Sequence, residues 1–522
     1  MTISVGFDSP MSRLMSFFRR YQNSTFFTRP SVQEAAEMQA LLVKYSGQLA
    51  TPHLDESADL NQGIRSFLMH SVGANRSRSF DGGLDFVGRA STNNLKSRSG
   101  PRRNMSRGTF ALDSIGSETT TVIRREDSQD SRGSFDTQRD SALISELLAE
   151  INVPAAVKSA IGNGFFLDFI SPSSPVSSCS HPVTLVVSQC LQSSKIFSIF
   201  TSRPKAYHKL LNFTTEVEMG YSDTMYHCKK HAADVTNRLM AIMTHSELAD
   251  LPCPRNHIPV SFVALIAAAV HDYGHPQLNN AFLVATGHPM ATRFNDQAVA
   301  ENHALHEVLW LLEDPSCDFI SNMAGDSDAP KRRRWFRSML IQMVLATDMS
   351  RHFELLSQFN TKVASSLDLA GLKTSEKWKL MTDEQRFLTL QISMKVADLG
   401  HCALPLELHK AWTEALEEEF FRQGDMEREL GMPISPLMDR FKPGATAPSN
   451  QIGFFKVVVM PLYTSLVKVF PQCQPLLDQA HANLTHWTAL ARQEQITEAD
   501  REPVLRPMAS AICSNRFGGR AA

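Results

Sequence analysis

The sequence predicts an all-α protein in which one compact multi-helix domain follows a largely disordered N-terminal region. From about Ser145 onward, long stretches carry apolar residues at positions i, i+3, i+4 and i+7, which is the spacing of one helix face. Alternating strand patterns are few, and turn signals such as Pro252 and His288-Pro289 separate the helical stretches. Residues 65–141 are instead rich in Ser, Arg, Asp and Gly, with too few apolar side chains to offset the entropy of ordering the chain.

The composition excludes several classes of protein. Of the 522 residues, 43% are hydrophobic and 20% are charged, which is typical of a soluble globular protein. The formal net charge of −2 gives no sign of a nucleic-acid binder. Eight cysteines without a C-x-x-C pair argue against a zinc finger and favour a reducing compartment. The longest obvious apolar run is Phe262–Val270, well short of the roughly 18 to 20 residues that span a bilayer. We therefore expect no transmembrane segment and a cytoplasmic location.

Residues 1–50 are expected to hold short amphipathic helices. Ser31 and Glu34 form a capping-box pattern, which opens a stretch with apolar residues at helical spacing (Ala35, Met38, Leu42 and Tyr45). A short helix is marginal in water, so we expect it to dock on the main domain or on a second copy in a homodimer. Residues 11–27 form a basic, amphipathic segment, for which a disordered tail is the favoured interpretation. Peripheral membrane contact, a calmodulin-like partner and a transit peptide remain the alternatives.

Residues 51–144 are predicted to be a disordered, Ser/Arg-rich regulatory linker. Between Arg65 and Arg107, nine basic residues stand against Asp81 and Asp85, which leaves a local charge of +7. Basic residues precede Ser79 and Ser106, a pattern that fits a basophilic kinase, and phosphate there would reverse the local charge. A regulatory kinase is therefore an expected partner, and a merely solvated linker is the alternative. Residues 501–522 are expected to be a flexible tail.

Histidine clusters in one part of the chain. Nine of the 18 histidines lie between residues 227 and 306. Two pairs are spaced four residues apart, which places each pair on one face of a helix; these pairs are His227 with His231 and His271 with His275. Asp272 and, in a later helical run, Asp398 add carboxylates. Imidazole and carboxylate together suit zinc and harder divalent ions, so the pattern predicts a catalytic metal site rather than a set of core histidines.

Six segments carry a resemblance to a known family. They are YHCKKHAADV, HDYGHPQLNNAFLVATGHPMATRFNDQAVAENH, VLATDMSRH, KVADLGH, EEEFFRQGDMERELGMPISPLMDR and NQIGFF. In this order they resemble the catalytic domain of class I 3′,5′-cyclic nucleotide phosphodiesterases, over about residues 160–490. The ELGMPISPLMDR run leans toward the calmodulin-dependent branch, and PLELHKAWT leans toward the cAMP-specific branch. The resemblance implies a compact, all-α, HD-like metal-dependent catalytic domain, which we place at residues 145–500.

The resemblance also implies a reaction. A Zn²⁺ ion would be held by His231, His271, Asp272 and Asp398. A second ion, Mg²⁺ or Mn²⁺, would share Asp272, and its water shell would be supported by His275, Glu301 and Thr347. A hydroxide between the two ions would attack the cyclic phosphate of cAMP or cGMP. His227 would act as the general acid that protonates the departing 3′ oxygen, giving a nucleoside 5′-monophosphate and ending the cyclic nucleotide signal.

Further residues match the family's substrate pocket. Gln451 matches the glutamine that hydrogen-bonds the purine, and Phe454 and Leu416 match the apolar clamp around it. An amide can present a donor or an acceptor, so Gln451 alone does not choose adenine over guanine. The remaining residues assigned to substrate binding are Tyr226, His401, Met349 and Asn280, with Asp348 beside Met349 on the pocket floor.

The sequence departs from the family pattern at several positions. Cys228 stands where Asn is usual, Ala304 replaces a second His after Glu-Asn-His, and Gln277 replaces a common Gly. His401 occupies a position that is Asn in cAMP-selective relatives and His in a dual-specificity branch, which leaves the choice between cAMP and cGMP open. Two other functions are weighed against the phosphodiesterase: an HD-type metal phosphohydrolase acting on another nucleotide, and a non-catalytic cyclic nucleotide-binding scaffold.

Overall fold

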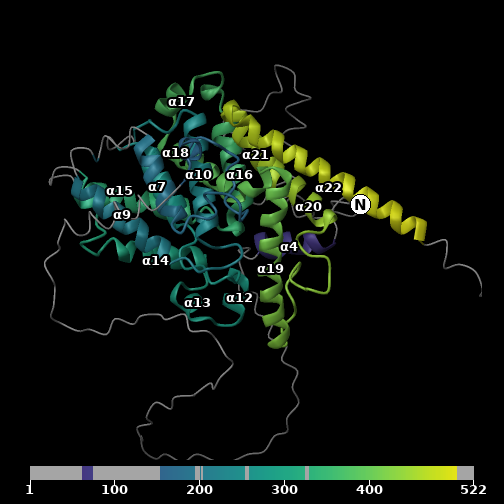
Figure 1. The fold of residues 1–522 in the computed structure, drawn as a ribbon. Coiled ribbons are helices and arrows are strands. Elements are labelled where there is room, and N and C mark those ends of the chain that lie inside the picture. The colour runs from purple at the N-terminus through teal and green to yellow at the C-terminus, as the bar shows by residue number, and fades with distance from the viewer. Residues whose placement is uncertain are drawn as a thin grey trace, which may run out of the picture. The chain divides into compact units, whose positions relative to one another are not determined.

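A computed structural model describes residues 62–73, 153–193, 200, 204–252, 258–323 and 329–501 (Figure 1). Within these ranges the regular elements are helices and no strand is present. The predicted all-α class is therefore confirmed. The helices expected in residues 1–50, the kinase sites at Ser79 and Ser106, and the tail at residues 502–522 lie outside the described residues.

The helical elements follow one another along the chain without long interruptions in the described parts. The first α-helices are α4 (Gln62–Gly73), α6 (Ala155–Ala160), α7 (Pro182–Ser193), α9 (Pro204–Met219), α10 (Lys229–His245), α11 (Val260–Val270), α12 (Asn280–Ala285), α13 (Pro289–Arg293) and α14 (Val299–Leu311). The later ones are α15 (Ala329–Val344), α16 (His352–Phe359), α17 (Thr374–Leu380), α18 (Asp383–Asp398), α19 (Leu406–Glu429), α20 (Pro448–Phe454), α21 (Met460–Val469) and α22 (Gln474–Arg501). Short 3₁₀ turns are η1 (Ile320–Asn322), η3 (Met349–Arg351), η5 (Leu367–Leu369), η6 (Leu399–Ala403) and η8 (Pro471–Cys473), and π turns are η4 (Asn360–Ala364) and η7 (Phe455–Val459).

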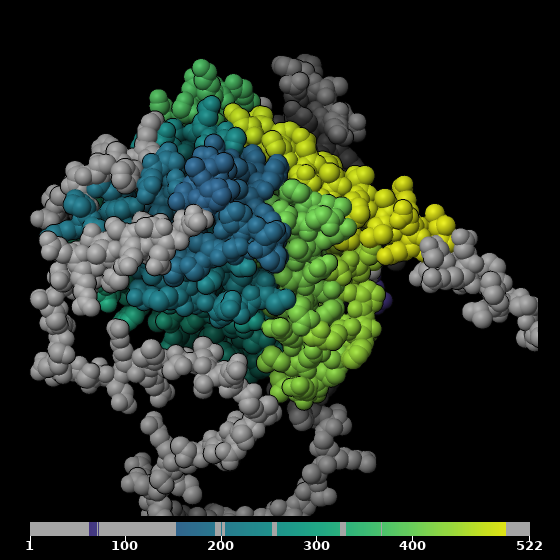
Figure 2. Space-filling model, viewed as in Figure 1, coloured from purple at the N-terminus to yellow at the C-terminus, as the bar shows by residue number. Residues whose placement is uncertain are grey.

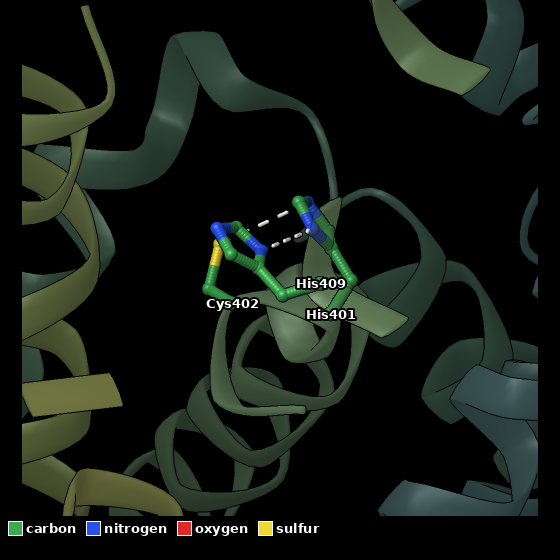
Figure 3. Close-up of side chains that lie close together, drawn as sticks. All are labelled: His401, Cys402 and His409. Carbon is green, nitrogen blue, oxygen red and sulfur yellow. Dashed lines mark hydrogen bonds between the residues drawn. The ribbon is translucent and has the colours of Figure 1, made fainter. Parts of the chain in front are cut away.

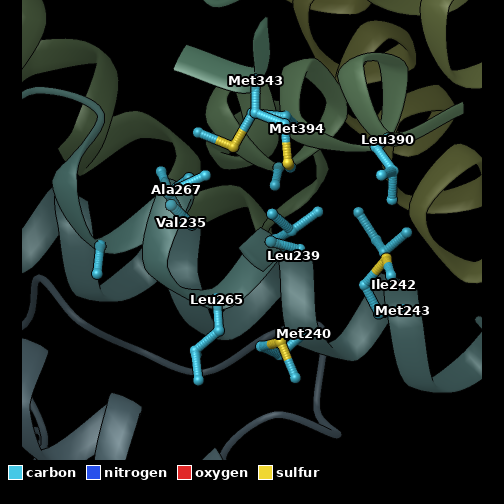
Figure 4. Packing of buried hydrophobic residues seen from close by; sticks show 14 of the residues in the cluster. Val235, Leu239, Met240, Ile242, Met243, Leu265, Ala267, Met343, Leu390 and Met394 are labelled. Atoms are coloured by element: carbon cyan, nitrogen blue, oxygen red, sulfur yellow. The ribbon is translucent and has the colours of Figure 1, made fainter. Parts of the chain in front are cut away.

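The centre of the core lies around α10 and α11. Every residue of α11 is buried, as expected for a helix that is apolar on all sides. Helix α10 packs against α11, α7 and α18, and α15 packs against α11 and α18. Figure 4 shows this packing: Leu239 and Ile242 of α10 lie in the same buried cluster as Met343 of α15 and Leu390 of α18. These central helices also carry metal-site candidates at or next to their ends, so the core fixes the site.

A buried ion pair joins α10 to the end of α18. Both terminal nitrogens of Arg238 donate to the Asp234 carboxylate at 2.7 Å, and Nη1 also donates to the Ala397 carbonyl at 3.3 Å. The Arg238 side chain is fully buried. A Cβ atom on Gly400 would lie 2.3 Å from Arg238 Nη1, so only glycine leaves room there for the guanidinium. The pair thus holds the end of α18, where Asp398 lies, against α10.

The loop at residues 430–447 crosses α19 in close contact. A Cβ atom on Gly424 of α19 would lie 1.7 Å from the Met438 carbonyl oxygen, so glycine is needed for this approach. One turn later, the buried Glu427 carboxylate accepts hydrogen bonds from the Ser435 hydroxyl at 2.6 Å and from Gln423 Nε2 at 2.9 Å. These contacts fix the loop that leads into α20.

Two expectations need correction here. Pro448–Val469 runs as one helical segment through α20, η7 and α21, and its length and mean hydropathy of 1.6 suffice to cross a membrane. The expectation that no apolar run approaches spanning length missed this segment, because its polar first residues and Lys456 interrupt the apolar stretch. Its only charged residues are Lys456 and Lys468. Half of this window is buried within the fold, and α21 packs against α22 and α18, as in the core of a soluble protein.

The second correction concerns the linker. Residues 62–73 lie inside the range predicted to be disordered, yet they form α4. Ile64 and Leu68 recur at helical spacing and are 1% and 0% exposed, because they pack against Val458 of η7. The rest of residues 51–144 lies outside the described part of the chain.

Candidate active site

Four side chains from three helix ends meet at the centre of the domain. His231 lies in the first turn of α10, His271 and Asp272 follow α11, and Asp398 is the last residue of α18. Asp398 Oδ1 lies 3.3 Å from Nε2 of both His231 and His271. Asp272 Oδ2 lies 2.9 Å from His271 Nε2 and 3.5 Å from His231 Nε2. The structure therefore brings together the four residues assigned to the metal.

The donor atoms fit a divalent ion. Both imidazole Nε2 atoms are buried and make no hydrogen bond, an arrangement that a bound cation would satisfy. His271 Nδ1 donates to the Ala268 carbonyl at 2.9 Å, which leaves Nε2 as the free ligand atom. In a tetrahedral zinc site with bonds of about 2.0–2.1 Å, neighbouring ligand atoms lie about 3.3–3.4 Å apart, close to the separations seen here. The set can thus hold a metal ion.

His227 stands beside this centre and is held by a carboxylate. Its Nδ1 contacts Glu419 Oε1 of α19, and its backbone N–H donates to Glu419 Oε2 at 3.3 Å. Burial alone would lower the pKa of His227, but the Glu419 and Asp272 carboxylates outweigh it and raise the pKa to about 9. His227 therefore carries a proton at neutral pH, as a general acid must.

His275 stacks on His227 with ring centroids 3.8 Å apart. Burial and the neighbouring charge of His227 lower its pKa to about 4, so it is neutral at neutral pH. Its Nδ1 accepts a hydrogen bond from the Gln277 N–H at 3.0 Å. Gln277 has a φ of 59°, a left-handed conformation that favours glycine. The structure thus places His275 next to His227 and close enough to Asp272 for that carboxylate to raise its pKa in part.

Glu301 lies near Asp272 and is hydrogen-bonded to Asn280. Its carboxylate accepts a hydrogen bond from Asn280 Nδ2 at 2.9 Å, and Asn280 Oδ1 accepts from the Ala300 N–H at 2.9 Å. Burial and the nearby Asp348 carboxylate raise the pKa of Glu301 to about 7. Asn280 therefore holds Glu301 in place, and its assignment to substrate binding stays a prediction.

Thr347, Asp348 and Met349 follow α15 in a turn. The Thr347 hydroxyl donates to the Val344 carbonyl at 2.7 Å, and Asp348 accepts from the Ser350 N–H at 2.8 Å. The buried Lys395 of α18 donates to the Ala346 carbonyl at 3.0 Å, which ties the turn to α18. Met349 packs against the cluster formed by Ile64, Leu68 and Val458 rather than standing free.

The residues assigned to the purine lie on α19 and α20. Gln451 is 6% exposed, and its Nε2 donates to the Ala445 carbonyl at 2.7 Å. Its Oε1 is buried and has no hydrogen-bond partner, so it is an acceptor left for a donor group. Phe454 follows Gln451 by three residues on α20, and both Phe454 and Leu416 of α19 are partly buried against the core. Their role as a clamp stays a prediction.

Tyr226 and His401 form ring contacts next to His231. The Tyr226 ring packs on His231, with centroids 4.7 Å apart, and meets the His401 ring edge-on at 5.9 Å. His401 in turn stacks on His409 of α19, with Nδ1 atoms 3.3 Å apart. Trp487 Nε1 donates to His409 Nε2 at 3.0 Å, so the proton of neutral His409 is on Nδ1. Burial lowers the pKa of His409 to about 4, partly offset by the nearby Gln451 amide.

His401, Cys402 and His409 lie close together but do not form a plausible second metal site (Figure 3). Cys402 Sγ faces Nε2 of His401 at 3.8 Å, whereas His409 faces Nδ1 of the same ring, so the three residues do not converge on one point. Burial also raises the pKa of the Cys402 thiol above its ordinary value, and a thiol must lose its proton to bind zinc. We read His401 and His409 instead as part of a chain of contacts that leads from Trp487 to Tyr226.

Sequence reasoning missed Glu419, His409 and Trp487. Glu419 stands in the run EALEEEFF, which looks like the solvated face of a helix, and its partner His227 is 192 residues away. Of the departures from the family pattern, Cys228 is buried at the start of α10 and Ala304 is buried in α14, and neither belongs to the four residues assigned to the metal.

The fold and site define a class: a helical domain in which two His and two Asp side chains that could hold a metal ion meet at helix ends, beside a histidine held by a carboxylate. Residues 226–480 match the model of the 3′5′-cyclic nucleotide phosphodiesterase family. The domain therefore belongs to the class I cyclic nucleotide phosphodiesterases.

Individual relatives agree with this membership. The chain is 35% identical over 317 residues to the 3′,5′-cyclic-AMP phosphodiesterase isoform F of Drosophila melanogaster, which covers 60% of this chain and 45% of that protein. It is 33% identical over 307 residues to a protein of Caenorhabditis elegans described as a probable 3′,5′-cyclic-AMP phosphodiesterase, with 58% and 43% covered. The matched part thus spans less than half the length of these two relatives.

A solved structure shows the same fold. The phosphodiesterase domain of the rhodopsin phosphodiesterase of Salpingoeca rosetta superposes with a TM-score of 0.51 at 26% identity, covering 61% of this chain and 90% of that one. A second structure of the same kind of domain from this organism gives a TM-score of 0.52 at 28% identity, covering 63% of this chain and 96% of the other.

Proposed function

We propose that this protein hydrolyses the 3′ phosphoester bond of cAMP and releases 5′-AMP. The observation that carries the proposal is the position of protonated His227 beside four convergent metal-ligand atoms. Two relatives whose names state cyclic-AMP phosphodiesterase activity support the choice of substrate. Hydrolysis of cGMP as well is a second possibility, favoured by a histidine at position 401 and by the two-way hydrogen bonding of an amide.

The metal would be held by His231, His271, Asp272 and Asp398, and we propose Zn²⁺ there. We propose Mg²⁺ or Mn²⁺ as a second ion that shares Asp272, with Glu301, Thr347 and His275 nearby as hydrogen-bonding partners for its water. Divalent ions at such a centre activate water at neutral pH and neutralise charge that develops on the phosphate.

The chain's own residues supply the proton and orient the purine of the substrate. His227 gives its proton to the 3′ oxygen as the P–O bond breaks, and Glu419 keeps the imidazole protonated and correctly turned. His275 stays neutral, so it adds no positive charge that would drive the proton from His227 early. The purine lies between Leu416 and Phe454, and its amino group or N–H satisfies the free Oε1 of Gln451.

Hydrolysis of cAMP and of cGMP by the full-length chain, with Zn²⁺ and either Mg²⁺ or Mn²⁺, tests the proposal. Asp398→Ala removes a ligand and is expected to abolish turnover, whereas Asp478→Ala, on the exposed face of α22, is the matched control and should leave turnover unchanged. Turnover that survives Asp398→Ala would overturn the metal assignment. Binding of cAMP without turnover in the wild type would favour a scaffold, and hydrolysis of other nucleotides alone would favour a general HD-type phosphohydrolase.

A further inference from the structure

A cavity opens between the end of α14 and the start of α15. Its volume is about 380 Å³. Its floor is apolar and is formed by Leu309, Leu312, Ile320 and Phe336. Each of the two helices has its active-site residue at its other end, because Glu301 lies in the first turn of α14 and Thr347 follows α15. In Figure 1 the two helices lie on the left of the domain, whereas α19 and α20, which carry the residues assigned to the purine, lie to their right. The cavity is therefore separate from the candidate active site.

Arginines line the mouth of this cavity. Arg333, Arg334 and Arg337 follow Pro330 at i+3, i+4 and i+7, so these cavity residues share one face of α15. A helix face with this spacing is apolar where it only packs against a core. Glu313 is the only acidic side chain among the described residues that line the cavity, and three arginines against it leave a local charge of +2. The cavity thus combines an apolar floor with a cationic rim.

One of the three arginines is fixed, and the other two are unpaired. Arg333 forms ion pairs with Glu313 at 2.8 Å and with Asp318 at 3.1 Å, which ties α15 to the segment after α14. Arg334 and Arg337 are exposed, and within the described part of the chain neither has an ion-pair partner. Their charges are therefore available to an anionic group from outside the protein.

An exposed tryptophan stands beside the same rim. Trp310 directly follows Leu309 and comes one helical turn before Glu313, and both of these neighbours line the cavity. Trp310 is 71% exposed. Three of the other four tryptophans are at most 4% exposed, namely Trp378, Trp412 and Trp487. An indole ring is amphipathic, and such rings are concentrated at the interface between a bilayer and water. The position of Trp310 therefore suits contact with a lipid surface.

An apolar cavity with a cationic mouth and an exposed indole fits an anionic lipid better than another anionic partner. Guanidinium groups form paired, charge-assisted hydrogen bonds with phosphate and carboxylate groups. The apolar part of a lipid gains free energy when it covers an apolar floor. An acidic protein would satisfy Arg334 and Arg337 but would leave that floor uncovered. Charge complementarity and the apolar floor together thus favour a membrane.

We propose that this end of the domain docks on a membrane surface that contains anionic phospholipids. The docking face consists of Leu309 and Trp310 of α14 with Arg334 and Arg337 of α15. The two arginines bind the anionic headgroup, Trp310 enters the interfacial layer, and the apolar part of the lipid covers the cavity floor. The inference does not rest on the proposed function, because none of these four residues belongs to the candidate active site.

Sedimentation of the full-length protein with lipid vesicles tests the proposal. Vesicles of phosphatidylcholine and phosphatidylserine in equal parts are compared with vesicles of phosphatidylcholine alone. The double variant Arg334→Gln with Arg337→Gln is expected to bind the mixed vesicles roughly tenfold more weakly or worse, because each cation near an anionic surface adds to the affinity. Lys379→Gln with Arg492→Gln removes the same charge from exposed positions on α17 and α22 and should bind as the wild type does. The basic stretch at residues 65–107 is unchanged in every variant.

Tryptophan fluorescence locates the contact on the docking face itself. Mixed vesicles whose lipids are brominated in the acyl chains quench an indole that enters the bilayer interface. The wild type should be quenched on binding, and Trp310→Ala should lose most of this quenching, since three of the remaining tryptophans are buried. Raised salt should weaken the binding of the wild type, because it screens the attraction between exposed arginines and anionic headgroups.

Three results would overturn the membrane contact. The first is equal binding of mixed vesicles by the wild type and by the variant that lacks Arg334 and Arg337, and the second is quenching that persists in Trp310→Ala. The third is binding to polyglutamate, lost in the double variant, without any binding to phosphatidylserine vesicles, which would indicate an acidic protein partner instead. Hydrolysis of cAMP without vesicles should be the same in all these variants, so vesicle binding is judged independently of the proposed function.

Discussion

The Glu419 carboxylate contacts His227 at two points: Oε1 contacts the ring Nδ1, and Oε2 accepts a hydrogen bond from the backbone N–H at 3.3 Å. The first contact raises the pKa of the imidazole against the effect of burial, and the second fixes the position of the residue just before α10. A residue of α19 therefore sets both the charge and the orientation of the proposed general acid, although the two lie far apart in sequence.

The pH dependence of hydrolysis should report this pair. Because the pKa of His227 is raised to about 9, the acid form persists at neutral pH, and kcat/KM should fall only as the pH rises through about 9. Glu419→Gln removes the carboxylate, so the pKa should drop toward the ordinary value of about 6.5 and the alkaline limb should move down by about two units. Glu418→Gln, which changes the half-buried neighbour that pairs with Arg440, is the control. An alkaline limb that stays in place in Glu419→Gln would contradict this role.

Loss of metal should destabilise the folded domain as well as inactivate it. His231, His271, Asp272 and Asp398 crowd polar atoms together in a buried site, and a cation that binds only the folded state stabilises it by mass action. Treatment with a chelator is expected to lower the melting temperature, and added Zn²⁺ should restore it. In Asp398→Ala the chelator should have little effect. A melting temperature of the wild type that ignores both chelator and Zn²⁺ would argue against a metal at this position.

The buried pair of Arg238 and Asp234 should matter for stability. Asp234→Ala leaves a fully buried guanidinium without its carboxylate, and breaking such a pair costs about 3–5 kcal/mol. Asp425→Ala, which breaks an exposed pair with Arg440, should cost no more than about 1 kcal/mol. Chemical denaturation measures both free energies of unfolding. Equal losses in the two variants would mean that burial of the Arg238 pair has no special effect.

Trp487 is expected to act on substrate binding through His409. Its indole N–H fixes the proton of His409 on Nδ1, on a ring that lies near Gln451. Trp487→Phe keeps an aromatic ring but frees Nε2, so the KM for cAMP should rise and the ratio of cAMP to cGMP hydrolysis should change, with kcat less affected. Trp310→Phe, at a position that is 71% exposed, is the matched control. If Trp487→Phe changes only the melting temperature, the contact is purely structural.

The sequence was sufficient for the fold class, because that class rests on local spacing, whereas the set of four metal ligands came from the family resemblance and stays a prediction. Apolar residues at helical intervals predict helices, and two His pairs with a neighbouring Asp pointed to a site. The structure brings His231, His271, Asp272 and Asp398 together at the ends of α10, α11 and α18. The expectation that each His pair shares one helix face was wrong, because His227 precedes α10 and both His271 and His275 follow α11. The contact between His227 and Glu419 could not be predicted, because nothing near Glu419 distinguishes it from the other glutamates of α19. The contact between His227 and Glu419 arises only from the tertiary packing of α19 against the start of α10.

Helix α4 escaped prediction for a related reason. Its three apolar contacts are too few to identify a helix within a Ser/Arg-rich region, and their partners lie on η7 and α19 near the other end of the chain. The apolar segment Pro448–Val469 was overlooked because its polar first turn masks its length. At the other end of the domain, the last turns of α22 extend away from the other helices (Figure 2), and residues 492–496 are exposed.

The central claim is that the His/Asp centre directs water to the phosphorus of cAMP while His227 protonates the 3′ oxygen. Hydrolysis of cAMP by the metal-loaded full-length protein in ¹⁸O-labelled water tests both halves at once. The account predicts 5′-AMP with one ¹⁸O atom in its phosphate, and a rate that falls by about a hundredfold or more in His227→Ala. Release of 3′-AMP, or an unlabelled phosphate, or a rate unaffected by His227→Ala would contradict it.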